Sequence, residues 1–157
     1  MSAPFPITKT SFRRKVWRDL SGQTGWKQRK ALVVSAFRPA GGPISVRFNR
    51  AVYRLGPNLL INMAFLAGFA TYGVWYLYFL LWLLPSMTWF LFISRLRNIG
   101  EHACVADNDD RLRNTRTTHA SWLERMFIAP YWVNYHLEHH LLVSCPCYRL
   151  RRAHRIL

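Results

Sequence analysis

Residues 55–94 form a stretch of 40 residues that contains no Asp, Glu, Lys, Arg or His. The hydrocarbon core of a bilayer is about 30 Å thick and is crossed by about 20 apolar residues in a helix, so this stretch is long enough for two short spans. We predict spans over residues 57–71 and 74–92. Two alternatives stay open: a single long tilted span that ends at Pro85, and a buried helical pair in a soluble protein.

The charges that flank this stretch predict its orientation. Of the 22 Lys and Arg residues, 12 lie in residues 1–54 and 10 in residues 95–157, whereas the expected hairpin tip near Tyr72 and Gly73 has none. Loops on the cytoplasmic side of a membrane carry an excess of Lys and Arg. We therefore expect a multi-pass membrane protein with both termini in the cytoplasm.

A basic amphipathic helix is expected over residues 11–20, with a stop at Gly22. Phe12, Val16 and Leu20 share one helical stripe, and four Lys or Arg residues lie elsewhere on the helix. Such a helix suits the surface of an anionic membrane. A nucleic-acid partner is the less favoured alternative, because the neighbouring stretch is so apolar. We expect the lipid bilayer as partner and no nucleic acid.

These patterns predict an all-α fold: two transmembrane helices as a hairpin, with cytoplasmic or interfacial amphipathic helices. Six of the seven acidic residues and all six histidines follow residue 94, so the chemistry is expected there. The expected organisation has three segments: a basic cytoplasmic or interfacial segment (1–54), the hairpin (55–94) and a cytoplasmic histidine-rich segment (95–157).

Three histidines in the string YHLEHH are candidate metal ligands. In a helix, His136, His139 and His140 fall within an arc of about 100°, and Glu138 falls on the opposite side. A face of neutral imidazoles suits iron, zinc or copper. A run of exposed polar residues is the simpler alternative for this motif taken alone.

His102 is the fourth candidate nitrogen ligand, because it directly follows the second expected span. Asn98 lies four residues earlier and therefore on the same helical face. Glu101 and Asp107 are expected to orient imidazole N–H groups by hydrogen bonds, as residues around metal-binding histidines commonly do.

Residues 134–142 (NYHLEHHLL) resemble the third histidine box of the membrane fatty acid desaturase family. Residues 6–25 resemble the linker that follows the second box in bacterial members. The resemblance implies a helical membrane protein with a cytoplasmic di-iron site, of which His102, His136, His139 and His140 would supply part. Further segments share it: RNIGEHA at 97–103, RTT at 116–118, and Pro146-X-Tyr148-X-Leu150 with His154.

The resemblance also implies an activity, O₂-dependent desaturation of an acyl chain. The substrate would be an acyl lipid, and two electrons would come from a ferredoxin-like or cytochrome b5-like donor. Family enzymes bind two irons through eight or more histidines from three boxes, and this chain lacks the first two boxes, an HxxxH box and a first HxxHH box. We therefore expect a truncated or inactive form when the chain is isolated.

Two alternatives without catalysis stay open. His139, His140, Cys145 and Cys147 offer two nitrogen and two sulfur donors within nine residues, a tetrahedral zinc set with unusually compressed spacing. The chain could also be a purely basic membrane-associated module that binds no metal.

Overall fold

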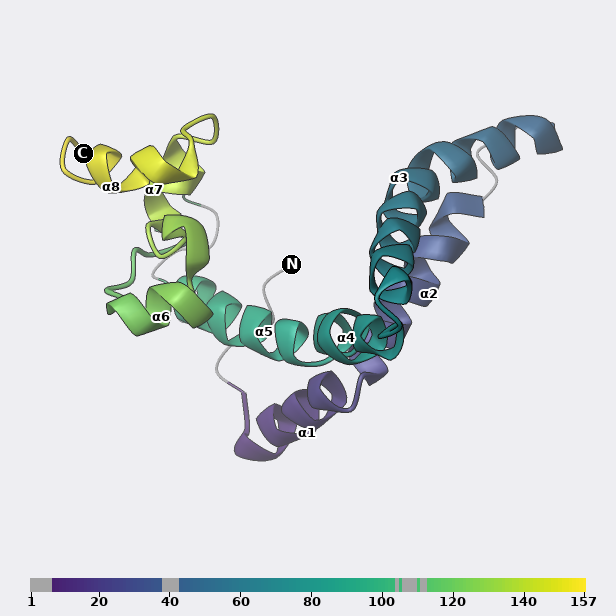
Figure 1. The fold of residues 1–157 in the computed structure, drawn as a ribbon. Coiled ribbons are helices and arrows are strands. Elements are labelled where there is room, and N and C mark those ends of the chain that lie inside the picture. The colour runs from purple at the N-terminus through teal and green to yellow at the C-terminus, as the bar shows by residue number, and fades with distance from the viewer. Residues whose placement is uncertain (1–6, 38–42, 104, 106–109, 111–112) are drawn as a thin grey trace. The chain divides into compact units, whose positions relative to one another are not determined.

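The computed structural model describes residues 7–37, 43–103, 105, 110 and 113–157 (Figure 1). These residues contain helices and no strand, which confirms the all-α prediction. The chain divides into two compact units, one made of Met1–Arg13 with Phe92–Leu157 and the other of Arg14–Leu91.

Two helices precede the apolar stretch. Helix α1 (Lys9–Leu20) matches the predicted amphipathic helix, and Gly22 ends it with φ of 78°. Sequence reasoning missed helix α2 (Gln23–Phe37), which begins directly after this turn. The fully buried Asp19 accepts a hydrogen bond of 2.7 Å from the Thr24 hydroxyl and so ties the end of α1 to the start of α2.

The apolar stretch folds back on itself at the predicted tip. Helix α3 (Ile44–Thr71) begins well before residue 55, so it crosses the expected boundary between the first two segments. It contains Pro57, which lacks an N–H and bends a helix, and Figure 1 shows α3 bent. Gly73 has φ of 71°, and it reverses the chain without the penalty that a side chain would bring.

The returning arm is not a regular α-helix. It consists of a π-helix η1 (Tyr78–Leu83), a short helix α4 (Leu84–Met87) and helix α5 (Trp89–His102). The N–H of Leu84 bonds the carbonyl of Phe79, five residues back. Pro85 follows directly, and its ring would clash with the carbonyl four residues earlier in a regular helix. The wider π turn relieves this clash.

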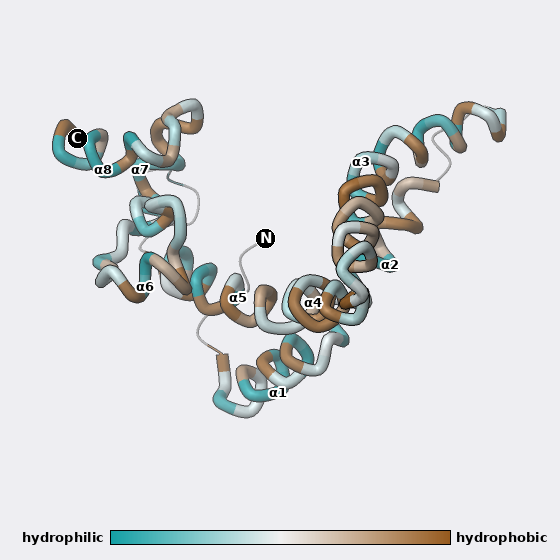
Figure 2. The backbone as a smooth tube through the Cα atoms, in the orientation of Figure 1, coloured by the Kyte–Doolittle hydropathy of each residue, from teal (hydrophilic) through white to brown (hydrophobic). Residues whose placement is uncertain are grey.

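A single segment of the described residues is long and apolar enough to cross a membrane. It runs over the 25 residues Tyr78–His102. The predicted first span over residues 57–71 is not confirmed. Arginines occupy the first half of α3, and Pro57, Asn58 and Asn62 lower the hydropathy of the second half. Figure 2 shows hydrophobic residues concentrated on α4 and the neighbouring part of α3.

Asn62 joins the two arms of the hairpin. Its side-chain oxygen accepts hydrogen bonds from the Tyr78 hydroxyl at 2.8 Å and the Trp82 indole at 3.1 Å. The rings of Phe65 and Trp82 pack beside it, with centroids 4.9 Å apart. In apolar surroundings such bonds hold helices together, because a lone polar group there finds no water.

Replacing Asn62 by leucine is therefore expected to loosen the hairpin. The variant loses two interhelical hydrogen bonds, which are each worth about 0.6–1.7 kcal/mol in membrane proteins, so unfolding should cost about 1–3 kcal/mol less. Urea unfolding of the protein in detergent, followed by Trp fluorescence, measures this. Asn58→Ala is the matched control: it removes one exposed hydrogen bond from the Asn62 amide, which keeps the Asn58 carbonyl as acceptor, and it leaves both interhelical bonds in place. Equal losses in both variants would contradict the assignment.

Helix α2 packs against α3 and α4, and its buried Gly25 lies against Met87 of α4. A Cβ atom at Gly25 would lie 2.5 Å from the carbonyl oxygen and 2.8 Å from the Cα of Met87. Backbone atoms cannot move aside as a flexible side chain can, so only glycine fits here.

Gly25→Ala is expected to destabilise the protein by about 1–3 kcal/mol, the usual cost of overpacking a close contact. Gly68→Ala is its matched control, because a Cβ there meets nothing within 4 Å and alanine favours a helix by up to about 1 kcal/mol. Thermal unfolding should thus shift in opposite directions. A shift of the same sign in both variants would rule out the close contact as the cause.

The rest of the chain forms short helices. Helix α6 (Trp122–Phe127) begins with a capping box between Ser121 and Glu124. After it come a 3-10 helix η2 (Pro130–Trp132), helix α7 (His136–Leu141), a 3-10 helix η3 (Cys147–Arg149) and helix α8 (Leu150–Ala153). Helices of this length hold their shape through tertiary contacts, because nucleating a helix is costly.

Candidate metal centre

The segment over residues 114–118, which belongs to no helix, connects the end of α5 to the start of α7 by hydrogen bonds. The hydroxyl of Thr115 and the backbone N–H of Arg116 donate to the carbonyl of Glu101, at 3.0 and 3.1 Å. Further along, the N–H of Thr118 donates to the carbonyl of Asn134 at 2.9 Å, and the Asn134 amide donates back to the Thr118 carbonyl at 3.0 Å. This segment therefore sets the position of α7 relative to the last turn of α5.

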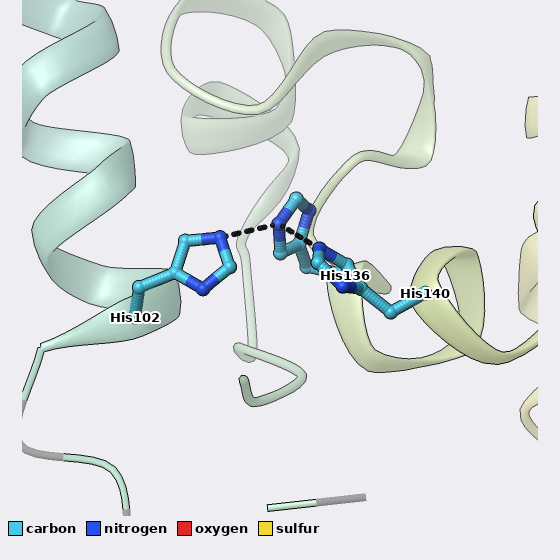
Figure 3. Close-up of side chains that lie close together, drawn as sticks. All are labelled: His102, His136 and His140. Atoms are coloured by element: carbon cyan, nitrogen blue, oxygen red, sulfur yellow. Dashed lines mark hydrogen bonds between the residues drawn. The ribbon is translucent and has the colours of Figure 1, made fainter. Parts of the chain in front are cut away.

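Three histidines from the two helices meet there. Figure 3 shows His102, the last residue of α5, with its imidazole directed at His136 and His140 of α7. The Nε2 atoms of His102 and His136 are 2.9 Å apart, and those of His136 and His140 are 3.1 Å apart. One ligand atom from each of the three residues lies within 4.8 Å of the others. His102 and His136 are 34 positions apart in sequence, so only the fold brings His102 to the two histidines of α7.

The surroundings favour neutral imidazoles with lone pairs available. Burial lowers the pKa of His136 to about 4, and the neighbouring His140 and His102 act in the same direction. Burial also lowers the pKa of His140, with further contributions from His102 and His139. The Nδ1 of His102 lies 3.2 Å from the carbonyl of Asn114. A carbonyl only accepts, so this Nδ1 carries the proton and leaves Nε2 as a donor to a metal.

This donor set fits one transition-metal ion. Neutral imidazole is a common protein ligand for iron and zinc, and three imidazoles leave positions open for other ligands. The Nδ1 of His136 is buried without a partner in the described part of the protein. The carboxylate of Glu101 lies 3.7 Å from the Nε2 of His136 and is paired with Arg97 at 3.4 Å. A buried carboxylate beside the imidazoles adds charge that would favour a cation.

The structure brings together three of the four predicted ligands. His139 is exposed on α7, with its ring 5.9 Å from that of His136 and 6.0 Å from that of His140, and it lies outside the cluster. The expected place of Glu138 on the opposite side of the helix is confirmed, because its carboxylate contacts Thr117 and His154. Metal binding by His102, His136, His139 and His140 stays a prediction.

Other predicted partners do not join the cluster. Among the described residues, the group of three ligand atoms includes neither Cys145, which is half-buried, nor Cys147, which is exposed. Glu101 lies 3.7 Å from Nε2 of His136, which is beyond hydrogen-bond distance, so its expected role in orienting an imidazole N–H stays a prediction. Asp107, the second residue expected to orient an imidazole, lies outside the described residues.

Sequence reasoning missed three contacts around the site. It did not find the Asn114 carbonyl beside His102, because a backbone atom carries no sequence signal. It also missed Thr117 and His154 as partners of Glu138. Thr117 and His154 both occur in segments that resemble the family, and this resemblance was the only indication in the sequence that they have a role near the site.

Comparison with known proteins identifies the family. The fatty acid desaturase family profile matches residues 2–157. The chain is 25% identical over 142 residues to dihydrorhizobitoxine desaturase of Bradyrhizobium elkanii, an alignment that covers 90% of this chain and 40% of that protein. The chain thus spans well under half the length of this curated relative. No solved structure is significantly similar to it. The protein belongs to the fatty acid desaturase family.

Proposed function

We propose that this chain carries part of the iron site of a membrane fatty acid desaturase. His102, His136 and His140 would hold the metal, with His139 as a further ligand after a change of its side-chain rotamer. The observation that carries the proposal is the convergence of three imidazole nitrogens within 4.8 Å, in a chain whose family profile match covers residues 2–157. Iron held by these residues would activate O₂, the oxidant, for removal of hydrogen from an unactivated methylene, which no side chain can do alone.

Metal loading of the purified protein tests this proposal. Protein in detergent, incubated with Fe²⁺ without oxygen and then freed of excess metal, should retain about one ion per chain. His119 is exposed and stands outside the group of three ligand atoms, so we do not expect it to hold the retained ion. Retention of zinc that is lost in Cys145→Ser would favour a zinc-stabilised module instead. A protein that retains no metal while still associating with membranes would favour the basic module without catalysis.

The isolated chain is expected to lack desaturase activity. Family enzymes use eight or more histidines for two irons, and a cluster of three imidazoles, or four with His139, supplies at most about half of that set. We expect no detectable double-bond formation when the iron-loaded chain is given an acyl lipid, O₂ and a chemical reductant. Mass spectrometry of the lipid measures this. Turnover at a rate that scales with protein concentration would contradict the expectation.

We further propose that the substrate is an acyl lipid and that electrons come from a ferredoxin-like or cytochrome b5-like protein. A basic surface supports a partner of acidic character: the formal charge of the chain is +15, and the C-terminal residues Arg149, Arg151, Arg152 and Arg155 are all exposed. The relative from Bradyrhizobium elkanii is named a desaturase, which is consistent with the reaction class.

For the membrane arrangement we propose a multi-pass hairpin with both termini in the cytoplasm. The apolar segment over residues 78–102 and the hydrogen bonds from Tyr78 and Trp82 to Asn62 support it, because they pair α3 with the returning arm. Helix α6 would lie at the membrane interface, since its apolar residues are exposed. Cysteine labelling from each side of sealed vesicles tests this: Tyr72→Cys, at an exposed position beside the turn, should react from the outer side, and Cys147 from the cytoplasmic side.

A further inference from the structure

Helix α7 carries two residues of the histidine cluster, yet it is only six residues long. A helix of this length does not hold its own orientation, because its few backbone hydrogen bonds do not offset the cost of nucleation. A rotation of α7 about its axis by one residue would turn His136 and His140 away from His102 by about 100°. A contact on the face opposite the histidines must therefore set this rotation.

Glu138 makes that contact. Its side chain points away from the cluster and is buried, with a residue exposure of 3%. One carboxylate oxygen accepts a hydrogen bond from the hydroxyl of Thr117 and the other from Nδ1 of His154, both at 2.5 Å. Burial alone raises the pKa of Glu138, but the two hydrogen bonds outweigh it and the pKa is lowered, so the carboxylate is ionised at neutral pH. Hydrogen bonds to an ionised acceptor are short and strong.

The two donors come from both sides of α7 in the sequence. Thr117 belongs to the segment over residues 114–118, which is also bonded to Glu101 beside His102. His154 directly follows α8, which is anchored by the buried Leu150 and Ala153. The ring of His154 also packs on Tyr135, just before α7, with centroids 5.1 Å apart. Glu138 thus connects α7 to two independent anchors.

We propose that Glu138, held by Thr117 and His154, is a positioning residue that aims His136 and His140 at His102. The role of the segment after α7 is then to orient metal ligands, although none of its residues lies in the cluster. This inference rests on the proposed metal site for its biological meaning, but the positioning itself exists in the metal-free protein.

His154 is the best residue at which to test the proposal. Its side chain is 46% exposed and forms part of the wall of an open cavity of about 420 Å³ together with Thr117, Asn134 and Tyr135. Truncation there removes a hydrogen bond without leaving a hole in a packed core. His154→Ala removes the donor, and His154→Asn restores it, because the asparagine amide nitrogen occupies nearly the position of the histidine Nδ1. His119→Ala is the matched control, since His119 is exposed and lines the same cavity without contacting Glu138.

Two measurements apply to all four proteins. Co²⁺ titration in detergent gives an affinity and a visible absorption spectrum, and the spectrum reports the geometry of the ligands. We expect His154→Ala to bind Co²⁺ about 10–100-fold more weakly, as for other residues that orient metal ligands, and with an altered band shape. His154→Asn should recover most of both properties, and His119→Ala should match the parent.

The second measurement needs no metal. The ¹⁵N and ¹H shifts of the His136 and His140 rings in the apoprotein should change in His154→Ala and stay unchanged in His119→Ala. If the parent protein binds no Co²⁺ but the ring shifts still change in His154→Ala, the proposed metal site is overturned and the positioning role is supported. Parent-like ring shifts and spectrum in His154→Ala, or an asparagine variant as perturbed as the alanine variant, would overturn the positioning role.

Discussion

Replacing His136 by alanine is expected to lower the affinity for a divalent transition metal by at least about 100-fold. His136 is the middle member of the cluster, with its Nε2 2.9 Å from that of His102 and 3.1 Å from that of His140. Its loss leaves only His102 and His140 of the three imidazole donors in this cluster. Changes to residues that merely orient ligands cost about 10–100-fold, so the loss of a ligand should exceed that range. Competition titration with a chromophoric chelator measures the affinity.

His139→Ala is the matched control for this experiment. His139 lies on the same six-residue helix but is exposed, and it stands outside the group of three ligand atoms. We expect its replacement to weaken binding by less than about tenfold. The sequence predicted equal roles for both histidines, so the pair separates the two interpretations. A loss at His139 as large as that at His136 would mean that the metal site forms from a different set of donors.

Glu138→Leu is expected to lower the free energy of unfolding by about 2–4 kcal/mol. The substitution removes two hydrogen bonds to an ionised group, which are each worth about 1.5–3 kcal/mol, and burial of the leucine side chain offsets part of the loss. It also leaves the Thr117 hydroxyl without its acceptor. Chemical unfolding in detergent at neutral pH measures the change.

Glu124→Leu provides the comparison for Glu138. Glu124 is exposed, and hydrogen bonds with the backbone and side chain of Ser121 at the start of α6 lower its pKa. Loss of this exposed capping box should cost clearly less than loss of the buried contacts of Glu138. Similar losses at the two positions would show that the buried carboxylate contributes no more than an exposed cap, which would contradict its place as the anchor of α7.

Sequence patterns predicted the elements with a strong local signal. The uncharged stretch gave the helical arms, and Tyr72 and Gly73 mark the turn between them. The stripe of Phe12, Val16 and Leu20 predicted α1. Helix α2 was missed, because its apolar residues follow no clear helical stripe and its first turns contain Gly25. A glycine is needed at position 25 because the Met87 backbone approaches it closely, and this contact is visible only in the structure.

Of the two predicted membrane spans, only the second coincides with a segment of the described residues that is long and apolar enough to cross a membrane. A count of charged residues does not register Asn58, Asn62 and Pro57, which lower the hydropathy of the first arm. In the structure, the side-chain oxygen of Asn62 accepts hydrogen bonds from Tyr78 and Trp82 on the returning arm, which explains a polar residue at this position. Pairings across a turn depend on how two helices pack, and that information is not local in the sequence.

What the sequence by itself determined is the helical class, the position of the turn, the family and the set of histidines from which a metal site could be built. These follow from local patterns: hydropathy, spacing along a helix and a nearly contiguous motif. The tertiary structure decided which histidines meet. It joined His102 to His136 and His140 and left His139 exposed, because residues 114–118 and the contact of Glu138 with His154 set the rotation of α7. A helix only six residues long takes its orientation from such distant contacts.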